Sequence, residues 1–80
     1  MQELYTRLAD ILTSQFGVDE SALTPTATFE ALELDSLDLV EITLVVDDEL
    51  GVRIPDDRLE DIVTVQDAVD VIAELSGVAA

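Results

Sequence analysis

The sequence predicts an all-α fold: a small four-helix bundle of three main helices and one short helix, with a long loop between the first two. Three stretches carry apolar residues at helical spacing, and glycine follows each of them, at Gly17, Gly51 and Gly77. No stretch alternates between apolar and polar residues as a strand would. The chain has 80 residues, nearly half of them apolar, so we expect residues 1–80 to form a single domain with a modest core.

The first helix is expected over residues 2–16, where apolar positions recur every three or four residues. Residues 18–34 then form a long connection, because serine, threonine and proline interrupt the helical periodicity there. Within this connection, residues 19–23 favour a short helical turn. A loop of this length in a compact domain is usually packed against the core or functional.

The second helix is expected over residues 36–50. Asp35 is a suitable N-cap, and Asp38 and Glu41 follow it near the positive end of the helix dipole. Around the helix, one apolar stripe has the spacing of a core face and comprises Leu39, Ile42, Val46 and Leu50. A second apolar stripe, Leu37, Val40 and Leu44, lies on the opposite face among acidic residues. From this helix alone, the second stripe is either a recognition surface or another buried face.

The third helix is expected over residues 56–62, after Pro55, which suits a first helical turn. Only Leu59 and Ile62 anchor it, so it should be the least stable element. The fourth helix is expected from Val65 to the residue before Gly77. It begins after Thr64-Val65-Gln66-Asp67, which resembles a capping box with aspartate in place of glutamate.

Charge is the strongest feature of the composition. Nineteen acidic residues against three basic ones give a net charge of −16. Such a chain repels nucleic acid and anionic membranes, so we expect neither as a partner, whereas basic protein surfaces should attract it. No apolar run approaches transmembrane length and no leader-like segment begins the chain, so the predicted location is cytoplasmic.

Catalysis and metal binding are both disfavoured. The chain has neither cysteine nor histidine, which removes the thiol nucleophile, the usual general base and the commonest metal ligands. The best calcium candidate begins at Asp47, but a calcium-binding loop needs glycine at its sixth position, and Val52 stands there. We therefore predict no catalytic residue and no metal site.

Ser36 is the remaining reactive group, at the first position of the second helix. No base is evident in the chain to activate it, so a self-contained hydrolase is not expected. Its useful trait is an exposed hydroxyl at a helix start, where backbone N–H groups favour a phosphate. This position indicates a hydroxyl that another enzyme modifies.

The run Asp35-Ser36-Leu37, followed by Asp38 and Glu41, resembles the phosphopantetheine attachment site of acyl carrier proteins. The resemblance covers essentially the whole chain. It includes Arg53-Ile54-Pro55-Asp56 and Thr64-Val65-Gln66-Asp67-Ala68 before the last helix. The chain departs from the family at Glu33, where many members have glycine.

The resemblance implies that a phosphopantetheinyl transferase attaches 4′-phosphopantetheine to Ser36, with Asp35 and Leu37 as motif neighbours, and that the arm holds acyl groups as thioesters. It implies a monomeric carrier for fatty acid or polyketide biosynthesis, two pathways that look alike at this level. The initial methionine and the compact length favour a free-standing protein. Basic patches of ketosynthase, acyltransferase, reductase and similar enzymes would bind the recognition residues Leu37, Asp38, Val40, Glu41, Leu44, Asp47 and Asp48. A pocket for the acyl chain would be lined by the pocket residues Phe29, Leu39, Val46, Leu50, Ile54, Leu59, Ile62 and Ala68.

Two other classes of function compete with the carrier. One is an acidic helical interaction module that binds a basic protein and has no prosthetic group. The other is a calcium-responsive module. The intact mass of protein from a host that has a transferase separates the carrier from both.

Overall fold

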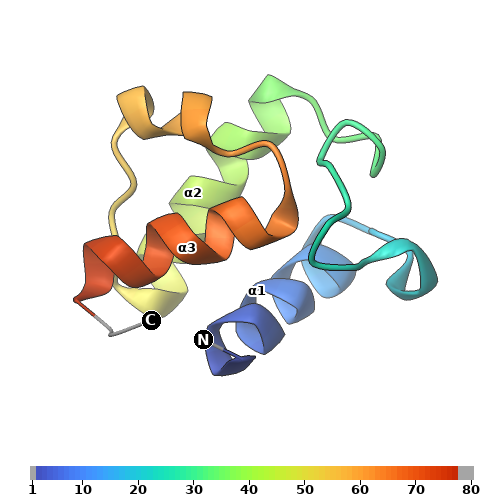
Figure 1. Ribbon diagram of the computed structural model, residues 1–80, viewed down its shortest axis with the longest axis horizontal. Helices are drawn as coiled ribbons and strands as arrows, with labels where there is room; N and C mark the ends of the chain where they lie inside the picture. Colours follow the sequence, from blue (N-terminus) through green and yellow to red (C-terminus); the bar gives the residue numbers. More distant parts are fainter. Residues whose placement is uncertain (1, 78–80) are drawn as a thin grey trace.

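The structure, a computed structural model, describes residues 2–77 of the chain, without the side chain of Gln2. The described part is helical, as predicted, and its elements follow one another as shown in Figure 1. In chain order these are α1 (Gln2–Gln15), the 3-10 helix η1 (Glu20–Ala22), α2 (Ser36–Leu50), the 3-10 helix η2 (Asp56–Asp61) and α3 (Val65–Ser76). None of the described helices is long and apolar enough to span a bilayer.

The start and end of α2 lie where the sequence predicts them. Asp35 and Asp38 form a capping box: the Asp38 N–H donates to Asp35 Oδ1 at 3.0 Å, and the Asp35 N–H donates to Asp38 Oδ2 at 3.1 Å. At the other end Gly51 has a φ of 69°, a left-handed conformation that glycine adopts without steric cost. Its N–H donates to the Asp47 carbonyl. Ile42 and Val46 are the buried residues of this helix.

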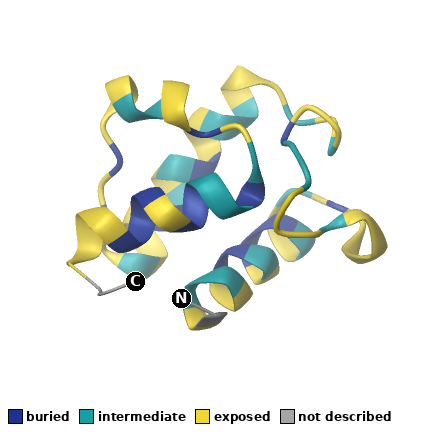
Figure 2. Ribbon diagram, in the orientation of Figure 1, coloured by how far each residue is buried: buried dark blue, intermediate teal, exposed yellow. Residues whose placement is uncertain are grey.

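The third main helix, α3, is the most deeply buried element (Figure 2). Six of its twelve residues are buried, among them Val65, Val69 and Ile72. Thr64 and Asp67 form the predicted capping box at its start. The backbone N–H groups of Thr64 and Val63 donate to the Asp67 carboxylate and lower its pKa. Both α1 and η2 pack against α3, so this helix organises the core.

The connection between α1 and α2 is held along the start of α3 by backbone hydrogen bonds. The Phe29 N–H donates to the Val63 carbonyl at 3.0 Å, and the Val65 N–H donates to the Ala27 carbonyl at 3.0 Å. Thr28 and Thr64 form an isolated antiparallel bridge between these two bonds. Phe29 is buried in the core. The loop is therefore fixed immediately before it reaches Ser36.

Two boundaries differ from the predicted ones. The first helix ends at Gln15 rather than at residue 16, although the Phe16 N–H still donates to the Leu12 carbonyl. The predicted helix 56–62 is a 3-10 helix that ends at Asp61. Pro55 supplies no side-chain cap, and η2 contains no buried residue. Six residues without a cap or a buried face are too few to favour α-helical hydrogen bonding, so the tighter form is adopted.

Candidate functional site

Ser36 is the first residue of α2, and its side chain is exposed. Within residues 2–77 its hydroxyl makes no hydrogen bond, and the backbone N–H groups of Ser36 and Leu37 have no acceptor. These two N–H groups belong to the helix start, whose unsatisfied donors carry the positive end of the dipole. The site therefore combines an accessible hydroxyl with nearby donors that favour an anion.

The residues around Ser36 hold it in a defined geometry. The Asp35–Asp38 capping box fixes the first turn of α2. On the loop side, the Leu34 N–H donates to the Phe29 carbonyl at 3.0 Å, which ties the segment before the site to the buried Phe29. Asp38, predicted for partner recognition, is half-buried and serves the helix start as well.

Glu33, three residues before Ser36, has a φ of 63° and is the one described non-glycine residue with positive φ. This left-handed conformation favours glycine, which many members of the resembled family have at this position. The loop thus keeps a glycine-type backbone while it presents an exposed carboxylate. The sequence showed only that Glu33 departs from the family's glycine, and it did not predict this backbone conformation.

The second apolar stripe of α2 is exposed. The exposed fractions are 73% for Leu37, 40% for Val40 and 63% for Leu44. The alternative that this stripe forms another buried face is therefore wrong. Acidic side chains that are also exposed surround it, namely Glu41, Asp47 and Asp48. We call these residues, together with Asp38, the outer face of α2; it is an apolar strip bordered by carboxylates.

The predicted pocket residues lie in one apolar cluster. Five of them are buried, namely Phe29, Val46, Ile54, Ile62 and Ala68. Leu39, Leu50 and Leu59 are half-buried and pack against these. Three surface hollows lie within residues 2–77, and Leu50 is the one residue of the eight that lines any of these three. The eight side chains therefore pack on one another, and only Leu50 borders any of these hollows.

Acidic side chains do not gather into a metal site in the described part of the chain. No group of three or more of them lies close enough together to hold an ion. The carboxylates around α2 are instead spread along its exposed side. This distribution attracts cations and basic surfaces over a distance rather than coordinating one ion.

Comparison with known proteins identifies the family. Residues 6–72 match the family described as "Phosphopantetheine attachment site". The chain is 45% identical over 74 residues to the acyl carrier protein of Rubrobacter xylanophilus, and the alignment covers 91% of each chain. The chain belongs to the acyl carrier proteins. An acyl carrier protein from Thermotoga maritima has a similar crystal structure, with a TM-score of 0.83, 25% identity, and coverage of 95% of this chain and 89% of that one.

An acyl carrier protein is a carrier and not itself an enzyme, and its prosthetic group is phosphopantetheine. A phosphopantetheinyl transferase and synthase-type enzymes are its general partners. The residues at the start of α2 fit such a group, because the Ser36 hydroxyl is exposed and unbonded and two N–H groups beside it lack acceptors within residues 2–77. When attached, phosphopantetheine supplies a terminal thiol that carries an acyl group as a thioester.

Proposed function

We propose that Ser36 is the residue that carries 4′-phosphopantetheine, and that the protein presents acyl chains on this arm to enzymes of fatty acid or polyketide biosynthesis. The observation that supports this most directly is the exposed Ser36 hydroxyl at the capped start of α2, which makes no hydrogen bond within residues 2–77. The backbone N–H groups of Ser36 and Leu37 would face the phosphate, and the Asp35–Asp38 box would keep the helix start from fraying.

The outer face of α2 is the proposed docking surface for partner enzymes. Leu37 and Leu44 offer exposed apolar contact, and Glu41, Asp47 and Asp48 surround them with negative charge. A basic patch with an apolar centre complements such a surface. We expect ketosynthase, acyltransferase and reductase enzymes to carry such a patch. Because the acids are exposed, the attraction should speed association and weaken as salt rises. The monomeric state and the cytoplasmic location of the protein stay predictions.

Acyl chains would be sheltered only in part. The pocket residues are buried or half-buried against one another, and protein interiors are close-packed, so admitting a chain requires side chains or a whole element to move. Burying each methylene of the acyl chain contributes only about 0.8 kcal/mol of favourable free energy. We propose that short chains are partly sheltered between α2, η2 and the core, and that long or polar chains stay mostly outside.

The attachment site is tested by intact mass. The purified protein is incubated with coenzyme A and a broad-specificity phosphopantetheinyl transferase, which should add one phosphopantetheine group. Ser36→Ala should fold, as judged by circular dichroism, and remain unmodified. Ser21→Ala is the matched control, because Ser21 is also exposed and lies near a helix start, two residues after the cap residue Asp19, but its hydroxyl donates to Asp19 Oδ1 at 2.8 Å. Loading of Ser36→Ala, or a wild-type protein that no transferase loads, would refute the proposal.

The alternative function, an acidic interaction module without a prosthetic group, is not favoured by the family match. It predicts that no mass is added under any of these conditions. The same experiment therefore decides between the two functions.

A further inference from the structure

The 3-10 helix η2 has little support of its own. It contains no buried residue, and Pro55 gives it no side-chain cap. Its hydrogen bonds are of the i→i+3 type, such as the one from the Ile62 N–H to the Leu59 carbonyl at 3.1 Å. These bonds have poorer geometry than those of an α-helix. Leu59, half-buried against the core, supplies its apolar contact.

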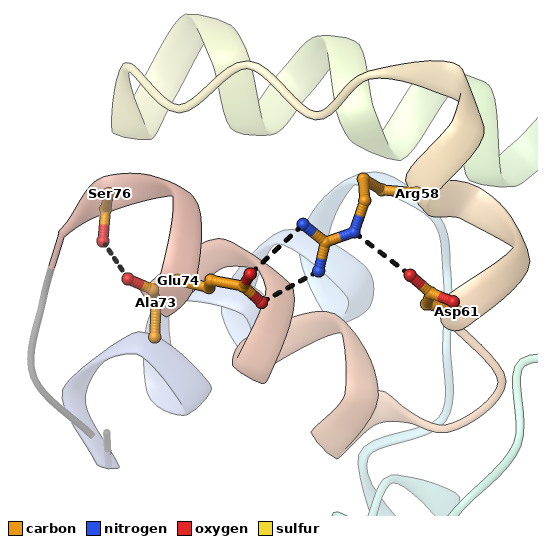
Figure 3. Close-up of polar contacts among 5 residues, drawn as sticks. All are labelled: Arg58, Asp61, Ala73, Glu74 and Ser76. Carbon is orange, nitrogen blue, oxygen red and sulfur yellow. Dashed lines mark hydrogen bonds and ion pairs between the residues drawn. The ribbon is translucent and has the colours of Figure 1, made fainter.

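One side chain connects η2 to a distant part of the fold (Figure 3). Arg58 reaches Glu74, sixteen residues further along in α3, through two parallel contacts: Nη2 to Oε2 at 2.9 Å and Nη1 to Oε1 at 3.4 Å. Its third nitrogen, Nε, donates to Asp61 Oδ2 at 3.1 Å within η2. The guanidinium is thus held by two carboxylates, one on its own element and one on α3.

This contact stands out in a chain of such high negative charge. Of the three arginines, Arg58 is the one that forms an ion pair with another described residue. Its side chain is 26% exposed, against 65% for Glu74. The hydrogen bonds that Arg58 donates to Glu74 and Asp61 raise the pKa of Arg58, and the contact with Arg58 lowers the pKa of Glu74. We call the Arg58–Glu74 pair the η2 tether.

The tether acts on the element that bounds the proposed acyl-chain pocket. Leu59 is the neighbour of Arg58, and Ile54 and Ile62 lie just before and just after η2. All three belong to the apolar cluster or pack on it. A chain that enters this cluster must displace some of its side chains, and we expect η2, which contains no buried residue, to move first and away from α3. The pair from Arg58 to Glu74 opposes that movement, whereas the pair from Arg58 to Asp61 moves with η2.

We infer that Arg58 is a positioning residue that limits how much acyl chain the carrier shelters, by tethering η2 to Glu74 on α3. This inference rests on the proposed function. The tether allows small displacements of η2, and short chains need no more than that. Longer chains need a wider opening and are kept outside while the tether holds.

Two neutralising variants distinguish a tether between η2 and α3 from an effect of Arg58 that is confined to η2. Glu74→Gln removes the ion pair that joins η2 to α3, and Asp61→Asn removes the ion pair inside η2; each deletes one negative charge and leaves one acceptor oxygen. Hydrogen exchange of the Ile62 amide in the unloaded protein reports the opening of η2. We expect it to be about two- to five-fold faster in Glu74→Gln than in wild type, the range that a partly exposed ion pair gives. Asp61→Asn should change it less, and Arg58→Lys should give an intermediate rate.

The Leu23 amide is the internal control, because it donates to the Glu20 carbonyl in η1, another 3-10 helix far from the tether along the chain. Its exchange should be the same in all variants. Faster exchange at both Ile62 and Leu23 would indicate general destabilisation and would overturn the inference. Equal effects of Glu74→Gln and Asp61→Asn on Ile62 would also overturn it.

The second readout is the dependence on chain length. Ser36 is loaded with butyryl- and octanoyl-phosphopantetheine, and amide chemical shifts at Ile62 and Ala68 are compared between the two forms. We expect the difference between the two forms to be at least about two-fold larger in Glu74→Gln than in wild type or Asp61→Asn, in proportion to the opening of η2. An unchanged difference would show that η2 opening does not admit the chain and would refute the inference. If Ser36 cannot be loaded in any variant, the proposed function fails, and the exchange comparison still decides whether the tether exists.

Discussion

Replacing Glu33 by glycine should stabilise the fold, because Glu33 holds a left-handed backbone with a φ of 63°. This conformation costs a residue with a side chain roughly 1–2 kcal/mol of conformational energy. Glycine removes that cost, but its freedom in the unfolded chain opposes the gain by about 0.4–1 kcal/mol. The expected net increase in the free energy of unfolding is therefore about 0.8 kcal/mol, within a range of about 0–1.6 kcal/mol.

The contacts around Glu33 should not offset this increase in stability. Its N–H donates to the Glu30 carbonyl at 3.0 Å, and the next N–H, of Leu34, donates to the Phe29 carbonyl at the same distance. These bonds hold the backbone whatever side chain is present. The Glu33 side chain is exposed, so its loss removes no buried contact.

Urea unfolding followed by circular dichroism measures the change, with Glu33→Gln as the control. Glutamine removes the charge, which also relieves repulsion in a chain of net charge −16, but keeps the conformational cost. The difference between the glycine and glutamine variants isolates the backbone contribution. If Glu33→Gly is no more stable than Glu33→Gln, the left-handed conformation carries no cost and the reasoning is wrong.

Two further predictions concern the two sides of α2 and the start of α3. Val46→Ala should lower the free energy of unfolding by about 1–3 kcal/mol because its side chain is fully buried. Leu44→Ala should change it by less than about 0.5 kcal/mol while slowing transferase loading; equal destabilisation in urea would contradict the division into two faces. Asp67→Ala should lower it by about 0.5–1.5 kcal/mol near neutral pH. Because the pKa of Asp67 is lowered from 3.8, its contribution is present above that value and disappears as the pH falls through the folded-state pKa. Urea titrations at several pH values measure the free energies of unfolding of wild type, Asp67→Ala and the control Asp48→Ala. The difference between wild type and Asp67→Ala should disappear at low pH. A difference that persists in strong acid would refute the carboxylate as its origin.

Local chemistry explains why most helix boundaries could be predicted from the sequence. Asp35 and Thr64 satisfy N–H groups three residues further on, and Gly51 ends α2 through its own backbone. Such signals act within a few residues, so they are readable without knowing the tertiary fold. The position of Ser36 at the helix start is predicted in the same way, because Ser36 directly follows the cap residue Asp35.

Contacts between distant residues account for what the sequence could not predict. The exposure of Leu37 and Leu44 depends on which side of α2 meets α1, and periodicity alone left both outcomes open. The 3-10 form of η2 and the pairing of Arg58 with Glu74 depend on how η2 meets α3. An arginine among nineteen acids has many candidate partners, and sequence spacing does not choose between them.

The ends of the three main helices have a practical consequence. Glu3 and Leu4 of α1, Leu50 of α2 and Ser76 of α3 line one hollow, so the beginning of α1 and the end of α3 meet at the C-terminal end of α2, as Figure 1 also shows. Ser36 lies at the opposite end of this fifteen-residue helix, about 21 Å away at a rise of 1.5 Å per residue. A surface anchor or fluorescent label attached at Glu3 or Ser76 would therefore lie at the end of the molecule opposite the serine. Immobilised in that way, the protein would keep its modification site turned towards the solution, where each enzyme in turn could reach it.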